Sequence, residues 1–271
     1  MTPPRSRRPP ARDRVRSSPS RSRGLGGEQV EGRQAVRELL RAGRRAAHDV
    51  WLAEGVDRAP ILGEIAALAA ERRVPVRRVG RARLDGEART QASQGVLAHA
   101  DPLPEADLDD LCRPAGGRPP FLVALDGVAD PQNLGALLRT AGAVGVTGAV
   151  LPRHRAVHVT PAVTKVAAGS IEHVPMAVVT GLPAGLARAR SLGVWVVGLD
   201  AGGDDDLFTL ELAGEPLVVV LGAEGAGLSR LVAQRCDVRA RIPLSGAIPS
   251  LNVAAAGAVA LVHLARHRPT D

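Results

Sequence analysis

The segment Val218-Val-Val-Leu-Gly-Ala-Glu-Gly-Ala-Gly-Leu-Ser229 joins an apolar strand to a glycine-rich turn that opens a helix. Outward from it, apolar runs rich in Val and Leu alternate with helical patterns. This alternation predicts an α/β domain whose parallel sheet is covered on both faces. The expected strands are 121–126, 148–151, 174–179, 194–199, 216–221 and 238–242. The expected helices are 134–144, 161–168, 183–192, 229–236 and 251–266.

The N-terminal part of the chain predicts a tail and a second, smaller unit. Residues 1–26 contain mainly Pro, Arg and Ser with little to bury, so we expect a disordered basic tail. Residues 27–100 predict a compact α/β unit, in which Gly43 ends the first helix. Its expected strands are 48–53, 74–79 and 94–98, and its helices carry Val36, Leu39 and Leu40, and then Ile61, Ile65, Leu68 and Ala69. Residues 101–118, rich in Pro and acids, predict a linker to the domain 119–271.

The positive charge belongs to the tail. The chain of 271 residues has a net charge of +7, and residues 1–23 hold eight Arg and one acid, so the remainder is neutral. Within that remainder, 27–100 carries +3 and 101–271 carries −3. This gradient predicts that a polyanionic partner is bound by the N-terminal unit, with the tail adding a non-specific, salt-sensitive attraction.

The composition argues against several classes of protein. The chain has four aromatic residues and no Tyr, which argues against an RNA-binding sheet that stacks bases. Its single lysine, Lys165, lies outside any phosphate-binding loop motif, which argues against a P-loop NTPase. Cys112 and Cys236 are too few for a disulfide framework or a four-thiolate zinc site.

We also expect no metal and no membrane segment. His154 and His158 are four residues apart, and His173 follows, but they lack a zinc-enzyme pattern. Asp204-Asp-Asp206 is interpreted as a solvated loop. The chain has no signal-peptide core and no run of about 18 apolar residues, so a cytoplasmic protein is expected.

Ligands of parallel sheets bind at the carboxyl ends of the strands, so we expect the site residues in the loops after Leu125, Leu221 and Ile242. The first loop opens the helix that holds Asn133 and Arg139, both expected to project toward one edge of the sheet. The alternative interpretation is that Asn133 caps the helix and Arg139 is a solvated charge.

The other two loops carry polar groups beside flexible backbone. The second has the spacing G-x-x-G-x-G with Glu224 inside it, which argues against a pyrophosphate ligand and hence against a nicotinamide-dependent oxidoreductase. In the third, Ser250 is a natural helix N-cap. Asn252 falls in the first turn of an apolar helix and needs a partner or a ligand.

Together these three ordered motifs resemble the SpoU/TrmH family of RNA 2′-O-ribose methyltransferases, over about 121–266. Glu31-Gly-Arg-Gln-Ala-Val-Arg-Glu-Leu-Leu40 and Gln94-Gly-Val96 are similar to that family's L30e-like substrate-binding domain. The resemblance implies a SPOUT-class α/β fold with a C-terminal trefoil knot, and a homodimer with its active site near the subunit interface. It also implies that S-adenosylmethionine is held largely by backbone groups of Leu221, Gly222, Ile242 and Leu251.

The resemblance further implies the catalytic residues. They are Asn133, Arg139, Glu224, Ser250 and Asn252. A guanidinium stays protonated in proteins, so we interpret Arg139 as a phosphate clamp and oxyanion stabiliser, with a role as base left open. Glu224 orients Arg139 or the loops, and the remaining three supply hydrogen bonds.

The two-domain layout is closest to the branch that methylates a guanosine of 23S rRNA. A tRNA target and a catalytically silent RNA-binding protein are the alternatives. The chain departs from the family pattern at Ala167 and Ser170, within the domain 119–271, and at Ser93, where the family commonly has His. The last departure bears on the choice of target nucleotide.

Overall fold

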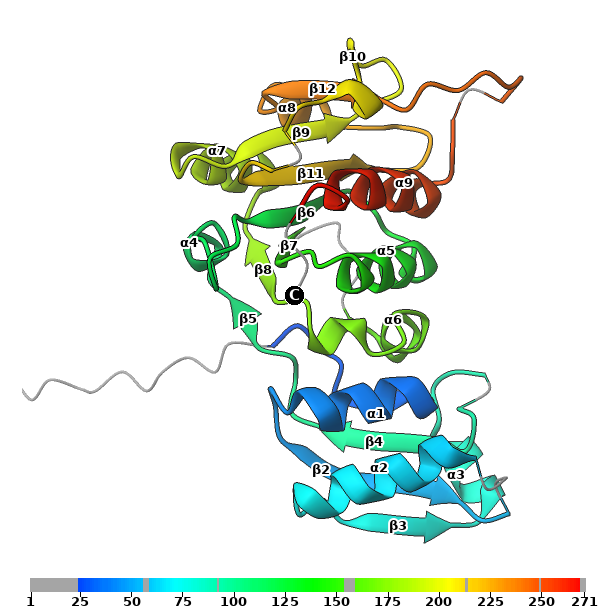
Figure 1. The fold of residues 1–271 in the computed structure, drawn as a ribbon. Coiled ribbons are helices and arrows are strands. Elements are labelled where there is room, and N and C mark those ends of the chain that lie inside the picture. Colours follow the sequence, from blue (N-terminus) through cyan, green and yellow to red (C-terminus); the bar gives the residue numbers. More distant parts are fainter. Residues whose placement is uncertain are drawn as a thin grey trace, which may run out of the picture.

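The computed structural model describes residues 24–55, 59–91, 93–153, 159–212, 214–248 and 250–268. In these residues the chain forms two α/β domains, each around its own sheet (Figure 1). The expected basic tail through residue 23 and the pair His154 and His158 lie outside the described residues. None of the described helices is long and apolar enough to cross a membrane.

The N-terminal domain has a four-stranded sheet in the order β1-β4-β2-β3. Its strands are β1 (Gln29–Glu31), β2 (Ala47–Ala53), β3 (Val76–Val79) and β4 (Val96–Ala100), and its helices are α1 (Arg33–Ala42), α2 (Pro60–Glu71) and α3 (Arg81–Glu87). The expected helices and strands are confirmed, whereas β1 and α3 were not predicted. Gly43 ends α1 with a left-handed φ of 57°, and its N–H donates to the Leu39 carbonyl, as expected for a helix stop.

The C-terminal domain has an eight-stranded sheet in the order β10-β12-β9-β11-β6-β7-β8-β5, and every strand pair in it is parallel. This confirms the α/β class. The strands are β5 (Glu105–Ala106), β6 (Phe121–Asp126), β7 (Gly148–Pro152), β8 (Met176–Val179), β9 (Trp195–Leu199), β10 (Asp205–Asp206), β11 (Leu217–Gly222) and β12 (Val238–Arg241). The helices are α4 (Leu108–Leu111), α5 (Pro131–Ala143), α6 (Pro161–Val166), α7 (Leu182–Ser191), α8 (Arg230–Ala233) and α9 (Val253–Ala265).

Helix α8 is shorter than the expected 229–236. The chain leaves the helix early because Asp237 is bonded to the start of β9: its N–H donates to the Val196 carbonyl, and its carboxylate accepts the Val196 N–H. These two hydrogen bonds hold Asp237 beside β9, so the chain continues from there as β12 rather than as helix.

The segment 101–118 is more than a linker. Within it, β5 pairs with β8 and extends the large sheet, and α4 follows. Leu25, expected in the disordered tail, is 6% exposed and belongs to the core of the C-terminal domain. Its N–H donates to the Leu103 carbonyl, so the chain enters and leaves the N-terminal domain through paired segments. Leu25 is ordered because its apolar side chain reaches a core that buries it.

Candidate active site

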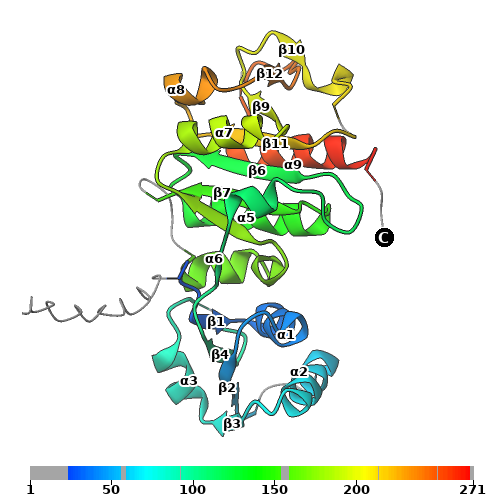
Figure 2. The same cartoon turned by 90° about the vertical axis from the view of Figure 1, so that its left-hand side faces the viewer.

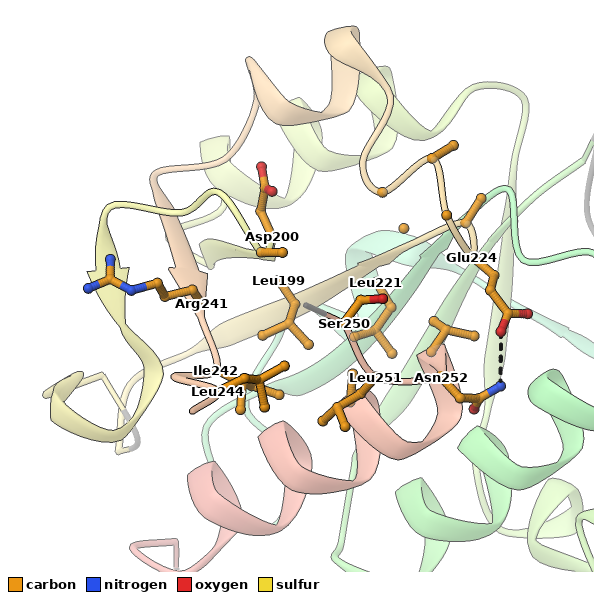
Figure 3. Close-up of a pocket in the computed structure, with 18 of the residues that line it drawn as sticks. Leu199, Asp200, Leu221, Glu224, Arg241, Ile242, Leu244, Ser250, Leu251 and Asn252 are labelled. Atoms are coloured by element: carbon orange, nitrogen blue, oxygen red, sulfur yellow. Dashed lines mark hydrogen bonds between the residues drawn. The ribbon is translucent and has the colours of Figure 1, made fainter. Parts of the chain in front are cut away.

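A cavity of about 880 Å³ opens at the carboxyl edge of the large sheet, where the loops after β9, β11 and β12 meet the start of α9 (Figure 3). Its volume lies in the range of small-molecule and cofactor sites. Seven of the expected site residues line it: Leu221, Gly222, Glu224, Ile242, Ser250, Leu251 and Asn252.

The floor of the cavity is the glycine turn after β11. Gly222 ends the strand, and Ala223 and Gly227 close the turn with two backbone hydrogen bonds of 3.0 and 2.9 Å. A Cβ atom at Gly222 would lie 2.2 Å from the carbonyl carbon of Gly227. The turn therefore closes only over glycine, and its tip places Glu224 at the rim of the cavity.

Hydrogen bonds of Asn252 connect the start of α9 with two segments that are far from it in the sequence, α5 and the glycine turn. Asn252 caps α9, accepting through Oδ1 from the N–H groups of Ala254 (2.9 Å) and Ala255 (3.3 Å). Its Nδ2 donates to Oδ1 of Asn133 at 3.0 Å. The same Nδ2 donates to Oε1 of Glu224 at 3.4 Å (Figure 3). The N-cap prediction for Ser250 is wrong, because α9 begins three residues later, at Val253.

Asn133 reaches this cluster from the first turn of α5, and it is 7% exposed. The N-cap of α5 is Asp130, whose carboxylate accepts the Gln132 N–H at 3.0 Å. The alternative interpretation of Asn133 as a helix cap is therefore wrong. Its amide instead accepts from Asn252, which satisfies a buried polar group.

The walls of the cavity offer apolar side chains and free backbone donors. Leu221 is buried beneath the glycine turn, Ile242 is half-buried, and Leu251 is 41% exposed. Within the described chain, the N–H groups of Ile242, Leu244 and Leu251 make no hydrogen bond. Such a site fits a ligand that has a flat apolar ring and several polar atoms.

Each of the two domains matches the model of a known protein family. Residues 120–262 match the model of the SpoU rRNA methylase family, and residues 29–106 match the model of RNA 2′-O ribose methyltransferase substrate binding. The chain belongs to the SpoU rRNA methylase family. This confirms the expected family and the expected enzyme class, an RNA methyltransferase.

Relatives of this SpoU chain extend over both domains. A Pseudomonas aeruginosa protein named 23S rRNA (guanosine-2′-O-)-methyltransferase RlmB is 41% identical over 244 residues, which cover 89% of this chain and 97% of the relative. An uncharacterized tRNA/rRNA methyltransferase of Mycobacterium avium is 40% identical over 272 residues, covering 98% of this chain and 87% of the relative. The AdoMet-bound rRNA methyltransferase of Sinorhizobium meliloti has a TM-score of 0.72 and 29% identity, over 88% of this chain and 87% of that one.

Arg139 lies apart from the other expected site residues of this SpoU chain. It follows Asn133 by six residues on α5, which corresponds to a rotation of about 240° and a rise of about 9 Å. Asn133 is buried, whereas Arg139 is exposed and makes no ion pair or hydrogen bond with any described residue. The expectation that both project toward one edge of the sheet is wrong within one chain, because six residues do not make whole helical turns.

Sequence reasoning missed the loop after β9. Asp200 lines the same cavity, accepts the Gly202 N–H at 2.9 Å and approaches Arg239 at 3.6 Å. Arg241 lines it too, donating to the carbonyls of Gly203 and Asp204. The signal was available, since the predicted strand that ends at Leu199 has its carboxyl end at the same edge of the sheet.

Among the described residues of this SpoU chain, no three His, Cys, Asp or Glu side chains gather closely enough to hold a metal ion. His173 instead lies 2.9 Å from Glu38 of the N-terminal domain.

Proposed function

We propose that the chain transfers a methyl group from S-adenosylmethionine to the 2′-hydroxyl of a guanosine in 23S rRNA. The observation that carries the proposal is the hydrogen-bonded cluster of Asn133, Glu224 and Asn252 at the rim of a cofactor-sized cavity. The substrate-binding domain and the named activity of the Pseudomonas relatives support RNA, and within it the 23S rRNA guanosine, as substrate.

The cavity suits S-adenosylmethionine. Leu221, Ile242 and Leu251 offer apolar surface to an adenine ring, and the free N–H groups of Ile242, Leu244 and Leu251 offer donors to its polar atoms. Gly222 lets the turn close against Gly227, and this closed turn shapes the part of the cavity that the ligand would contact. We propose that these groups hold the cofactor, as the family resemblance implies.

The chemistry needs a positioned ribose oxygen. S-adenosylmethionine supplies an electrophilic methyl group on a cationic sulfonium. Glu224 and Asn252 fix the rim where the ribose approaches, and Ser250 adds an exposed hydroxyl. Holding the 2′-oxygen in line supplies much of the acceleration. As the bond from the 2′-oxygen to the methyl carbon forms and the methyl–sulfur bond breaks, the hydroxyl proton would pass to solvent. Arg139 clamps an RNA phosphate and stabilises the oxyanion that develops, since its guanidinium stays protonated.

We propose that the C-terminal segment forms the trefoil knot of the SPOUT class. Strand β12 lies outside β9, yet α9 packs on α5 and β11, nearer the middle of the sheet. The chain between β12 and α9 therefore turns back past the cavity. A crystal structure with S-adenosylmethionine tests the threading and the backbone contacts together.

We propose that the enzyme is a homodimer. Arg139 is exposed on α5 and does not line the cavity of its own chain, and α9, packed on α5, exposes Val259 (36%) and Val262 (54%). A second copy covering this face would bury both valines and bring Arg139 toward the partner's cavity. Mixing inactive Arg139→Ala and Asn252→Asp subunits then restores activity, because mixed dimers contain one intact composite site. Failure to restore it in dimers that exchange subunits excludes the composite site.

The decisive experiment maps 2′-O-methylation across rRNA and tRNA in a strain that lacks the gene. Loss at one guanosine of 23S rRNA, restored by the wild-type gene, is the expected result. Loss at a tRNA position instead identifies the alternative substrate, and no loss anywhere favours a catalytically silent RNA-binding protein.

A further inference from the structure

The N-terminal domain carries a dense run of arginine that the active site does not use. Six of the twelve residues from 72 to 83 are Arg, and none is Asp or Glu. All six are exposed. We call this set the arginine strip: Arg72, Arg73, Arg77, Arg78, Arg81 and Arg83.

The strip follows one free edge of the small sheet. Among the described strands, β3 pairs only with β2, in parallel register, so its other edge carries no further described strand. Arg77 and Arg78 are neighbours on β3 and project from opposite faces. The strand and α3 lie at the end of the molecule farthest from α9 and β12 (Figures 1 and 2).

Internal carboxylates neutralise only part of the strip. Arg77 lies 3.4 Å from Asp49, and Arg81 lies 3.0 Å from Asp85. Within the described chain, Arg73, Arg78 and Arg83 have no carboxylate partner, and the Arg83 guanidinium lies over the Trp51 ring at 5.2 Å. By contrast, Arg37 and Arg41 on α1 pair with Glu38 and Glu64.

A solvated surface or a protected sheet edge does not need such an array, since a few charges suffice to block edge-to-edge pairing. Clustered guanidiniums without counter-charges repel one another, and a partner with closely spaced negative charges relieves that repulsion. We infer that the arginine strip binds the phosphate backbone of the RNA substrate, at a helix or strand remote from the methylated nucleotide. This inference rests on the proposed function and adds to it a second, sequence-independent contact.

The test compares two triple variants of the full chain that lose equal charge. One is Arg73→Gln, Arg78→Gln, Arg83→Gln in the strip. The control is Arg113→Gln, Arg188→Gln, Arg190→Gln on the C-terminal domain, where each arginine already pairs with an aspartate. Binding to protein-free 23S rRNA is measured from low to high salt, together with methyl transfer at saturating RNA.

We expect the strip variant to bind at least about tenfold more weakly near 0.1 M salt, with its log–log salt slope reduced by about two. Its kcat and its affinity for S-adenosylmethionine stay at the wild-type values, which also shows that it is folded. Equal binding by the two variants overturns the inference. So does a strip variant that binds RNA normally but loses binding to polyglutamate, which identifies an acidic protein as the partner. If the wild-type enzyme itself fails to methylate 23S rRNA, the proposed function fails instead.

Discussion

The guanidinium of Arg45 and the carboxylate of Glu172, 127 residues apart, form a two-point ion pair between the domains, with distances of 2.5 and 3.1 Å. Both side chains are almost fully buried, 2% and 1% exposed. Arg45 also donates to the carbonyls of Gly27 and Asp101, the two segments that connect the domains. The pair therefore fixes the substrate-binding domain against the catalytic domain.

Removing one charge from this pair destabilises the protein strongly. Glu172→Gln leaves the Arg45 guanidinium buried and unpaired, which costs about 3–5 kcal/mol. Chemical denaturation measures the loss. The double variant Arg45→Met, Glu172→Leu recovers most of it, and Arg113→Ala, from an exposed ion pair, changes stability little. An equal loss in the single and double variants would contradict a role for the charge pair.

Gly222→Ala distorts the glycine turn that lines the cofactor cavity. The added Cβ meets the backbone of Gly227 and Leu228, at 2.2 to 2.5 Å, so the turn must open. We expect calorimetry to show at least about a tenfold loss of affinity for S-adenosylmethionine, corresponding to about 1.4 kcal/mol. Gly246→Ala is the matched control, because Gly246 lines the same cavity with nothing within 4 Å of its Cβ position. Equal affinities in the two variants would exclude the turn as the binding element.

The variant Asn252→Asp tests a catalytic role of Asn252 separately from its role as the N-cap of α9. The aspartate keeps an oxygen acceptor for the N–H groups of α9 and suits the helix N-terminus. It loses the donor to Asn133 and places a carboxylate beside Glu224. We expect the melting temperature to change by a few degrees at most and kcat to fall about a hundredfold. Unchanged kcat would remove Asn252 from the catalytic machinery.

The variant Arg139→Lys tests whether methyl transfer needs the planar guanidinium of Arg139. Lysine keeps the charge but loses the planar fork, so we expect kcat to fall about a hundredfold or more while S-adenosylmethionine affinity is kept. Near-full activity would contradict both the phosphate clamp and the oxyanion role.

The two cysteines resist alkylation near neutral pH. Burial raises the pKa of both Cys112 and Cys236 to about 11, so the folded thiols stay protonated. Iodoacetamide labelling followed by mass spectrometry is expected to be slow at pH 8 and to accelerate toward pH 11. In denatured protein both thiols titrate near their ordinary pKa and react quickly. Fast labelling of the native protein at pH 8 would contradict this prediction.

The sequence by itself determined the α/β class, most strands and helices, and two of the three loops that line the cavity, those after β11 and β12. It did so because apolar periodicity, glycine stops and strand-to-loop transitions are local properties of the chain. The unexpected β1, β5 and β10 are three residues long or shorter, and only pairing with neighbouring strands defines them.

Only the tertiary structure decided which polar groups meet. In the structure, Asn133 and Asn252 are hydrogen-bonded although they are 119 residues apart, and Arg139 lies apart from both. The N-cap of α9 is Asn252 and not Ser250, and Asp200 also lines the cavity. The Arg45–Glu172 pair likewise has no local signal. The physical reason is that long-range contacts depend on how strands are ordered in the sheet and on the angular position of each residue around its helix, which sequence spacing alone does not specify.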